Sequence, residues 1–111
     1  MIPDIAKNKI RDVIKNELAT GLVGTDGTDP VVSNTDLGTP DLTTSNSVDS
    51  TVANKTINTT HILFSNQGNG SIYKELGLKF TDGTLYNRVV FPDFSKNSDV
   101  ELHTTIISRV N

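Results

Sequence analysis

Residues 72–91 read IYKELGLKFTDGTLYNRVVF, and this stretch decides the fold class. Its first half alternates with period two, as a strand does when one face lies in a core. The face expected in the core holds Ile72, Lys74, Leu76, Leu78 and Phe80. The Asp82-Gly83 pair suits a tight hairpin turn, because both residues tolerate the positive φ angles that such a turn requires. The second half, 85–91, is therefore expected to return antiparallel and to end at Pro92, because proline lacks the N–H that a sheet needs.

The register of this hairpin predicts a charge pair. Pairing across the turn places Leu85 near Phe80 and Val90 opposite Glu75. Glu75 then lies diagonal to Arg88, a distance that long side chains bridge. We expect Glu75 and Arg88 to hold the sheet together or to contact a neighbouring subunit.

Two further segments have strand patterns. Residues 56–64 are rich in β-branched side chains and place Ile57, Thr59, His61 and Leu63 on one face. Residues 100–110 alternate in the same way and are expected to form the last strand. With the hairpin, these segments predict at least four antiparallel strands.

An amphipathic helix is predicted over residues 3–19. Its apolar positions recur at steps of three and four, namely Ala6, Ile10, Val13, Ile14 and Leu18. Gly21 follows where a left-handed helix cap is expected. The opposite face, which includes Arg11, is expected to be solvent-exposed.

Residues 24–50 are dense in Gly, Pro, Asp, Ser and Thr, which favour turns over a persistent helix. Such a long loop is uncommon inside a compact domain. We expect an ordered arm lying on a neighbouring molecule, the alternative being a short strand near Val31 and Val32.

The predicted fold class is therefore α+β, mainly β. An N-terminal helix (1–23) and an extended arm (24–50) precede a small antiparallel β-sandwich (51–111), the whole forming one compact domain, with the helix stripe packed on the sheet.

Composition narrows the functional classes. Only 34% of the 111 residues are hydrophobic, which is a thin core for one domain and favours burial against other copies. A net charge of −3 disfavours nucleic-acid binding. The chain has no cysteine, no apolar run of membrane-spanning length and no signal-peptide pattern, so we expect neither a membrane partner nor secretory export.

The chain carries weak candidates for chemistry. His61 and His103 both fall in strands and would form an acid–base or metal pair if they faced each other, with Glu75 as a third group. Surface or half-buried roles are commoner for such histidines. Residues 24–29, GTDGTD, lack the terminal glutamate of a calcium loop. We therefore expect no catalytic residue, metal, cofactor or small-molecule substrate.

The order of the motifs along the chain indicates a class of protein more directly than these candidate residues do. A helix is followed by Gly24-Thr25-Asp26-Gly27-Thr28, by a Ser33-to-Gly38 step, by Tyr73-Lys74-Glu75-Leu76-Gly77-Leu78, by residues 85–91 and by a turn over 96–102. This succession resembles small structural proteins of tailed viruses, of the β-module type found in tail-fibre, tail-tip and baseplate components. The resemblance implies a non-enzymatic virion subunit whose partners are copies of itself and other virion proteins.

In this interpretation the chain is a tail, baseplate or fibre-attachment subunit, assembled in the host cytoplasm as a symmetric homo-oligomer through its helix and arm. The expected interface residues are Ile10, Val13, Ile14, Leu18, Val31, Val32 and Leu37. A capsid decoration, neck or collar subunit and a receptor- or carbohydrate-binding β module are the alternatives. A small hydrolase using His61 or His103 is a third possibility.

Overall fold

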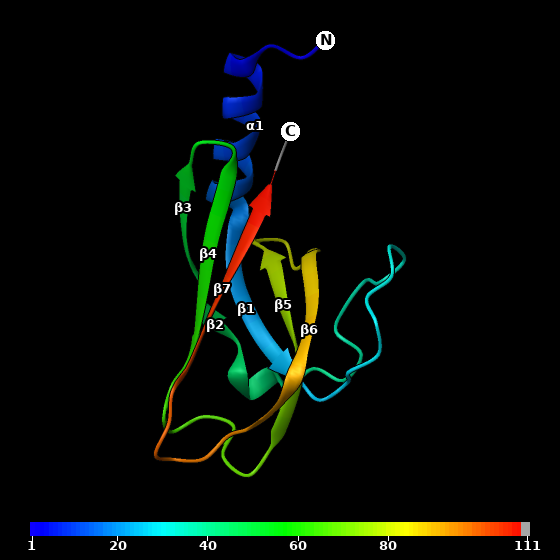
Figure 1. The fold of residues 1–111 in the computed structure, drawn as a ribbon, viewed down its shortest axis with the longest axis vertical. Coiled ribbons are helices and arrows are strands. Elements are labelled where there is room, and N and C mark those ends of the chain that lie inside the picture. The colour runs from blue at the N-terminus through cyan, green and yellow to red at the C-terminus, as the bar shows by residue number, and fades with distance from the viewer. Residues whose placement is uncertain (110–111) are drawn as a thin grey trace.

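The computed structural model describes residues 1–109 and contains a helix followed by two antiparallel sheets (Figure 1). One sheet has the strand order β2-β1-β5-β6 and the other has the order β3-β4-β7. The elements are α1 (Asp4–Glu17), β1 (Leu18–Gly24), the 3-10 helix η1 (Leu42–Thr44), β2 (Asn46–Ser47), β3 (Asp49–Ala53), β4 (Thr56–Leu63), β5 (Ile72–Phe80), β6 (Leu85–Ser95) and β7 (Leu102–Arg109). The predicted α+β, mainly β class is confirmed.

The helix ends earlier than predicted and runs directly into β1. Residues 18–24, which span the end of the predicted helical segment and the first residue of the predicted arm, form a strand that pairs with β5 from Leu18 opposite Phe80 to Gly24 opposite Glu75. Gly21 therefore lies inside a strand and not at a helix cap. Strand pairing with β5 outweighs the local helical periodicity, because propensity is a weak signal against tertiary contacts.

The orientation of α1 also differs from the prediction. Arg11 is the buried residue of the helix, whereas Ile10 and Val13 of the predicted core stripe are 40% and 54% exposed. Ile14 alone packs partly against the core cluster from this helix. The helix faces β3, β4 and β1 with the side that carries Arg11, because its direct connection to β1 fixes its rotation.

The hairpin forms around its predicted turn, but the register beside that turn differs from the prediction. Gly83 has a φ of 89°, and Glu75 pairs with Val90 as expected. The register shifts between Leu78 and Lys79, so Leu85 pairs with Lys79 rather than with Phe80.

Strand β6 continues through Pro92 to Ser95, contrary to the prediction that the proline ends it. The ladder is irregular between the Tyr73–Phe94 and Glu75–Val90 pairs, and this irregularity accommodates a residue without an N–H. The same irregularity interrupts the alternation of β5, so Tyr73 is fully buried whereas Ile72 is 49% exposed.

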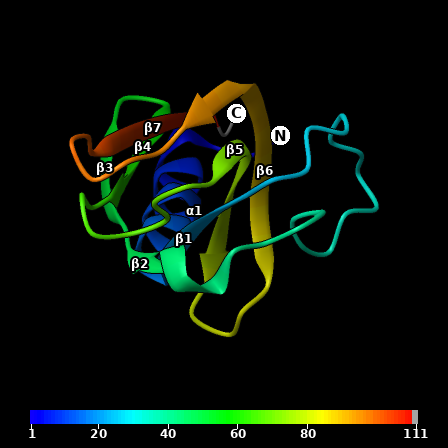
Figure 2. The same ribbon diagram turned by 90° about the horizontal axis from the view of Figure 1, so that it is seen from below.

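The core lies between the two sheets, which Figure 2 shows from one end. Strand β4 contributes Ile57 and Leu63 to the core, and β5 contributes Leu76 and Leu78. Strand β7 pairs with β4. Val110, at the end of the predicted last strand, lies outside the described residues.

Residues 25–41 form one long loop, which returns to its own sheet at both ends and projects beyond β6 in between (Figures 1 and 2). The rest of the predicted arm is structured, because it contains η1, β2 and the start of β3. The alternative considered for this segment, a short strand near Val31 and Val32, does not form. A turn replaces it, closed by a hydrogen bond from Asn34 N to Val31 O.

Candidate functional site

A buried carboxylate fastens the long loop to the sheet. Glu75, on β5, is fully buried and accepts backbone hydrogen bonds from Asp26 N at 3.0 Å and Thr39 N at 2.9 Å on Oε2. Gly38 N donates to Oε1 at 2.8 Å, and Arg88 Nε donates to the same atom at 2.9 Å. We call Glu75, Arg88 and these three loop N–H groups the latch.

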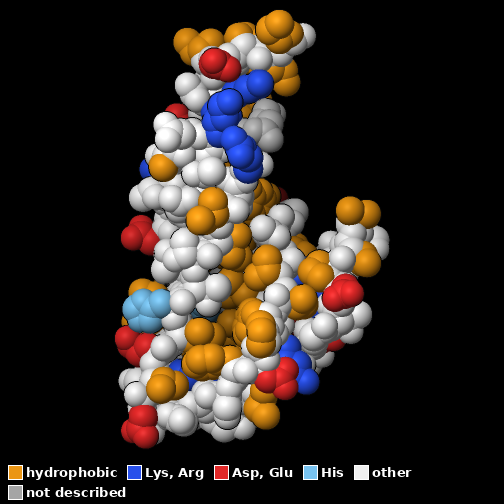
Figure 3. Space-filling view, in the orientation of Figure 1, with side chains coloured by type: hydrophobic (Ala, Val, Ile, Leu, Met, Phe, Trp, Pro, Cys, Tyr) orange, Lys and Arg blue, Asp and Glu red, His pale blue; other side chains and the backbone are white. Residues whose placement is uncertain are grey.

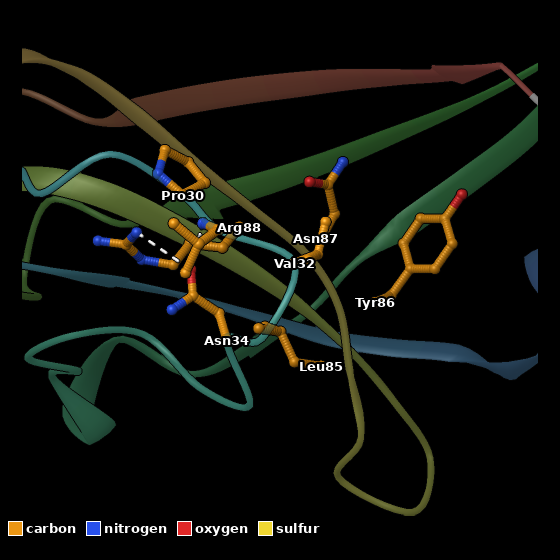
Figure 4. Close-up of a pocket in the computed structure, with 8 residues that line it drawn as sticks. Pro30, Val32, Asn34, Leu85, Tyr86, Asn87 and Arg88 are labelled. Atoms are coloured by element: carbon orange, nitrogen blue, oxygen red, sulfur yellow. Dashed lines mark hydrogen bonds between the residues drawn. The ribbon is translucent and has the colours of Figure 1, made fainter.

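Arg88 extends the latch along the loop. Its Nη2 donates to the carbonyl of Asp26 at 3.2 Å, and its Nη1 lies 3.5 Å from Asn34 Oδ1 (Figure 4). The predicted pair of Glu75 and Arg88 is therefore formed, and it is buried on both sides. Its use is wider than expected, because the pair closes a loop as well as joining two strands.

The electrostatics of the latch favour an ionised glutamate. Burial alone raises the pKa of Glu75, but hydrogen bonds from Thr39, Arg88, Asp26 and Gly38 outweigh it and bring the pKa below the ordinary value of 4.5. The carboxylate thus stays charged opposite the guanidinium.

Glycines allow the loop to approach this closely. A Cβ on Gly24 would lie 2.5 Å from Glu75 Oε2, and one on Gly77 would overlap Leu37 Cδ1. Leu37 is consequently 4% exposed, packed against its own sheet. The expectation that Leu37 faces a neighbouring molecule is therefore wrong, because the missing side chain at Gly77 makes room for it within the chain.

Most of the motifs that carried the resemblance meet at the latch. The Gly24-to-Thr28 segment, the step ending at Gly38 and Arg88 each donate a hydrogen bond to Glu75 of the Glu75-x-Gly77 strand. One local structure accounts for their spacing in the sequence. The loop needs a buried hydrogen-bond acceptor, which is Glu75, a positive charge beside that acceptor, which is Arg88, and glycines that leave space for its backbone.

The tip of the loop points away from this anchored base. Val31 and Val32 are 57% and 109% exposed, and Val31 N donates to Asn34 Oδ1 at 3.0 Å. The tip and the first half of β6, including Arg88, line a shallow polar pocket (Figure 4). Val31 and Val32, two of the predicted interface residues, are therefore exposed on a turn that hydrogen bonds with Asn34 stabilise.

The helix presents a second exposed apolar surface. Ala6, Ile10, Val13 and Ile14 line a groove of about 420 Å³ that also includes Lys9, and we call it the helix groove. Leu18, the last residue of the predicted stripe, is instead buried in the core as the first residue of β1. The prediction of an interface role is wrong for Leu18, because β1 carries it between the sheets.

A third apolar surface was not anticipated from the sequence. The edge strands β6 and β7 flank a groove of about 480 Å³ lined by side chains such as Phe91, Leu102 and Ile106. Figure 3 shows the hydrophobic side chains running down this face. The alternation within single strands does not predict this groove, because the groove is lined by two strands, β6 and β7, that belong to different sheets.

The two histidines do not form a pair. His61 is buried, with Nε2 at 3.1 Å from Thr44 O and with Nδ1 lacking a hydrogen-bond partner. His103 pairs with Ile62 across β4 and β7, so it lies on the opposite face, where it is exposed and contacts Glu101. The candidate joint site with Glu75 therefore does not form, because a shift of one residue moves a side chain to the other face of a sheet.

Sequence reasoning missed a buried lysine. Lys96 is 1% exposed, and its Nζ donates to Ser65 O, Asn69 Oδ1 and Asn97 O at 3.2, 2.8 and 2.8 Å. The lysine joins two loops at the end of the sandwich. An isolated lysine in a polar loop gave no indication of this role.

Within residues 1–109, no cluster of three or more acidic, histidine or cysteine side chains is placed to bind a metal ion. The helices in this range include none of sufficient length and hydrophobicity to span a membrane. Comparison with known proteins finds no matching family, no similar characterised protein and no similar solved structure.

Proposed function

We propose that this protein is a non-enzymatic assembly subunit that forms a symmetric homo-oligomer through α1 and the long loop. The observation that carries the proposal is the exposed apolar face of α1. Ile5, Ile10 and Val13 are 80%, 40% and 54% exposed on a helix of 14 residues. A helix this short is marginal by itself, and most helical stability in proteins comes from packing an apolar face.

The surrounding surface supports the same role. Other large hydrophobic side chains, Val31 and Val32, are exposed side by side on the long loop. Grouped apolar surface of this kind marks interaction sites in soluble proteins. Lys9 lies at the apolar groove on α1, as polar residues do at the rim of interfaces between folded partners.

The setting we propose is the virion of a tailed virus, in a tail, baseplate or fibre-attachment position, with other virion proteins as further partners. The motif order supports this setting, and the latch gives those motifs a common physical purpose. The latch holds an exposed loop in one conformation, which lowers the entropy lost on docking.

The test is the mass of the full-length chain in solution. Deleting residues 1–50 is unsuitable, because it also removes β1, which joins β2 to β5 within its sheet. Val13→Asp is the sharper variant, since Val13 is exposed and its replacement leaves the core intact. We expect a defined oligomer for the natural sequence and dissociation for Val13→Asp. A natural sequence that stays monomeric at micromolar concentration would overturn the proposal.

A further inference from the structure

We propose that the loop tip of one copy, Pro30–Val32, docks in the helix groove of a second copy, so that the copies join head to tail. This inference rests on the proposed function and names the two surfaces that meet. It differs from a symmetric helix-to-helix contact, in which the same surface would be used on both sides.

The loop tip has the properties of a protruding contact. Val32 is fully exposed and Val31 is mostly exposed, so a partner that covers them buries apolar surface that is now in contact with water. The latch holds the base of the loop, and a second ion pair, Lys79 Nζ to Asp36 Oδ1 at 3.1 Å, holds its returning half. The tip is therefore presented in a fixed conformation.

The helix groove has the complementary properties. Its lining is aliphatic apart from Lys9, and the side chains of Ile10 and Val13 border it with substantial exposure. Aliphatic side chains entering an aliphatic groove gain burial without leaving polar groups unpaired.

Charge determines which occupant fits this groove. The long loop carries four aspartates, Asp26, Asp29, Asp36 and Asp41, and no Lys or Arg. Asp26, Asp36 and Asp41 make hydrogen bonds or ion pairs within the chain, whereas Asp29 is exposed beside the tip. Lys9 is exposed at the groove, so docking brings Asp29 towards a basic side chain.

Two helix grooves meeting face to face are disfavoured by the same residue. Each copy would bring a Lys9 ammonium into a largely apolar contact with its counterpart, and two like charges in a desolvated interface repel. A loop with an aspartate beside two valines avoids this repulsion.

The two surfaces cannot meet within one chain. The loop projects beyond β6, and α1 lies at the other end of β1, away from the loop in both views (Figures 1 and 2). A contact between different surfaces of identical copies leaves one free surface at each end, so it forms a ring where the rotation between copies closes and an open filament where it does not. Because the proposed function expects a defined oligomer, we expect the ring.

The experiment compares Val32→Asp, Val13→Asp and their equimolar mixture by sedimentation velocity. Each variant alone is expected to associate at least about tenfold more weakly than the natural sequence, because an aspartate then lies in an apolar contact. In the mixture, Val32→Asp supplies an intact groove and Val13→Asp an intact tip, so pairs form and growth stops at two copies. Ile107→Asp, at a 68% exposed position on β7, is the matched control and is expected to associate normally.

Charge reversal gives a second readout that leaves the apolar contacts unchanged. Lys9→Glu and Asp29→Lys are each expected to weaken association by about three- to fivefold, and the double variant is expected to recover it. Circular dichroism checks that every variant folds.

The outcomes separate the two proposals. Dissociation by Val13→Asp with normal assembly of Val32→Asp keeps the proposed function and overturns the loop-to-groove contact. A mixture of Val32→Asp and Val13→Asp that forms no pairs also overturns this contact. So does a result in which Ile107→Asp is the only variant that dissociates. A monomeric natural sequence overturns both.

Discussion

Arg88 Nε lies 2.9 Å from Glu75 Oε1 across the β5–β6 pair, and this buried contact also determines where a distant loop closes. The same carboxylate binds backbone N–H groups that lie 36 to 49 residues earlier in the chain. One side chain therefore couples sheet pairing to the position of the exposed loop tip.

Glu75→Gln is expected to lower the free energy of unfolding by about 3 kcal/mol, because the amide leaves the buried Arg88 guanidinium without a counter-charge. Urea unfolding followed by circular dichroism measures this change. Glu101→Gln, at an exposed glutamate, is the control and is expected to change stability by less than about 0.5 kcal/mol. Equal unfolding midpoints for Glu75→Gln and the natural sequence would show that the latch does not stabilise the fold.

Hydrogen exchange tests the latch more locally. In Glu75→Gln the amides of Gly38 and Thr39 are expected to exchange faster than in the natural protein, because their acceptor is weakened. Amides of β4 serve as the internal reference. Exchange that stays unchanged at Gly38 and Thr39 would contradict the assignment of Glu75 as their acceptor.

Stability is expected to fall by about 1 kcal/mol between pH 7.5 and 5.5 because of His61. Burial lowers the pKa of His61 below 6.5, against the opposing effect of the hydrogen bond to the Thr44 carbonyl. Below pH 6.5 the unfolded chain therefore binds a proton that the folded chain resists, and stability decreases as the pH falls. The lowered pKa of Glu75 affects stability in a separate pH range. Its contribution to stability is complete above pH 4.5 and is lost only as the pH falls below that value.

Urea unfolding of His61→Gln at the same two pH values provides the comparison. We expect the variant to lack most of this pH dependence. If the natural protein and the variant lose stability equally, the titrating group is not His61.

Gly77→Ala is expected to destabilise the fold by about 1 to 3 kcal/mol, because the added methyl group overlaps Leu37. The test is a double-mutant cycle with Leu37→Ala. In the smaller Leu37→Ala background the added methyl group has space, so the second substitution is expected to cost much less than it does alone. Strictly additive effects would contradict direct packing of Leu37 on Gly77.

Lys96→Met is expected to lower the free energy of unfolding by about 2 to 4 kcal/mol, because it leaves three oxygen acceptors without their shared donor. Thermal unfolding measures the loss. Lys55→Met, at an exposed lysine, is the matched control. A Lys96→Met protein as stable as this control would show that the buried ammonium is dispensable.

Local sequence patterns predicted four of the strands, β4, β5, β6 and β7, and the hairpin that joins β5 to β6. The Asp82-Gly83 turn and the alternation of residues 72–80 depend on neighbouring residues alone, and they led to the pairing of Glu75 with Arg88. These features are predictable because the period of a strand and the φ angles of a turn are properties of a few consecutive residues.

Only the tertiary structure decided the conversion of residues 18–24 into a strand, the burial of Arg11 and Leu37, and the closure of the long loop on Glu75. Each depends on segments distant in sequence, such as β1 with β5 or Asp26 with Glu75, whose contacts outweigh local propensity. A helical periodicity ending at Leu18 holds no information about a strand more than fifty residues later that offers it a partner. The burial of one side chain instead of another follows from that partner, because pairing fixes both the register and the face.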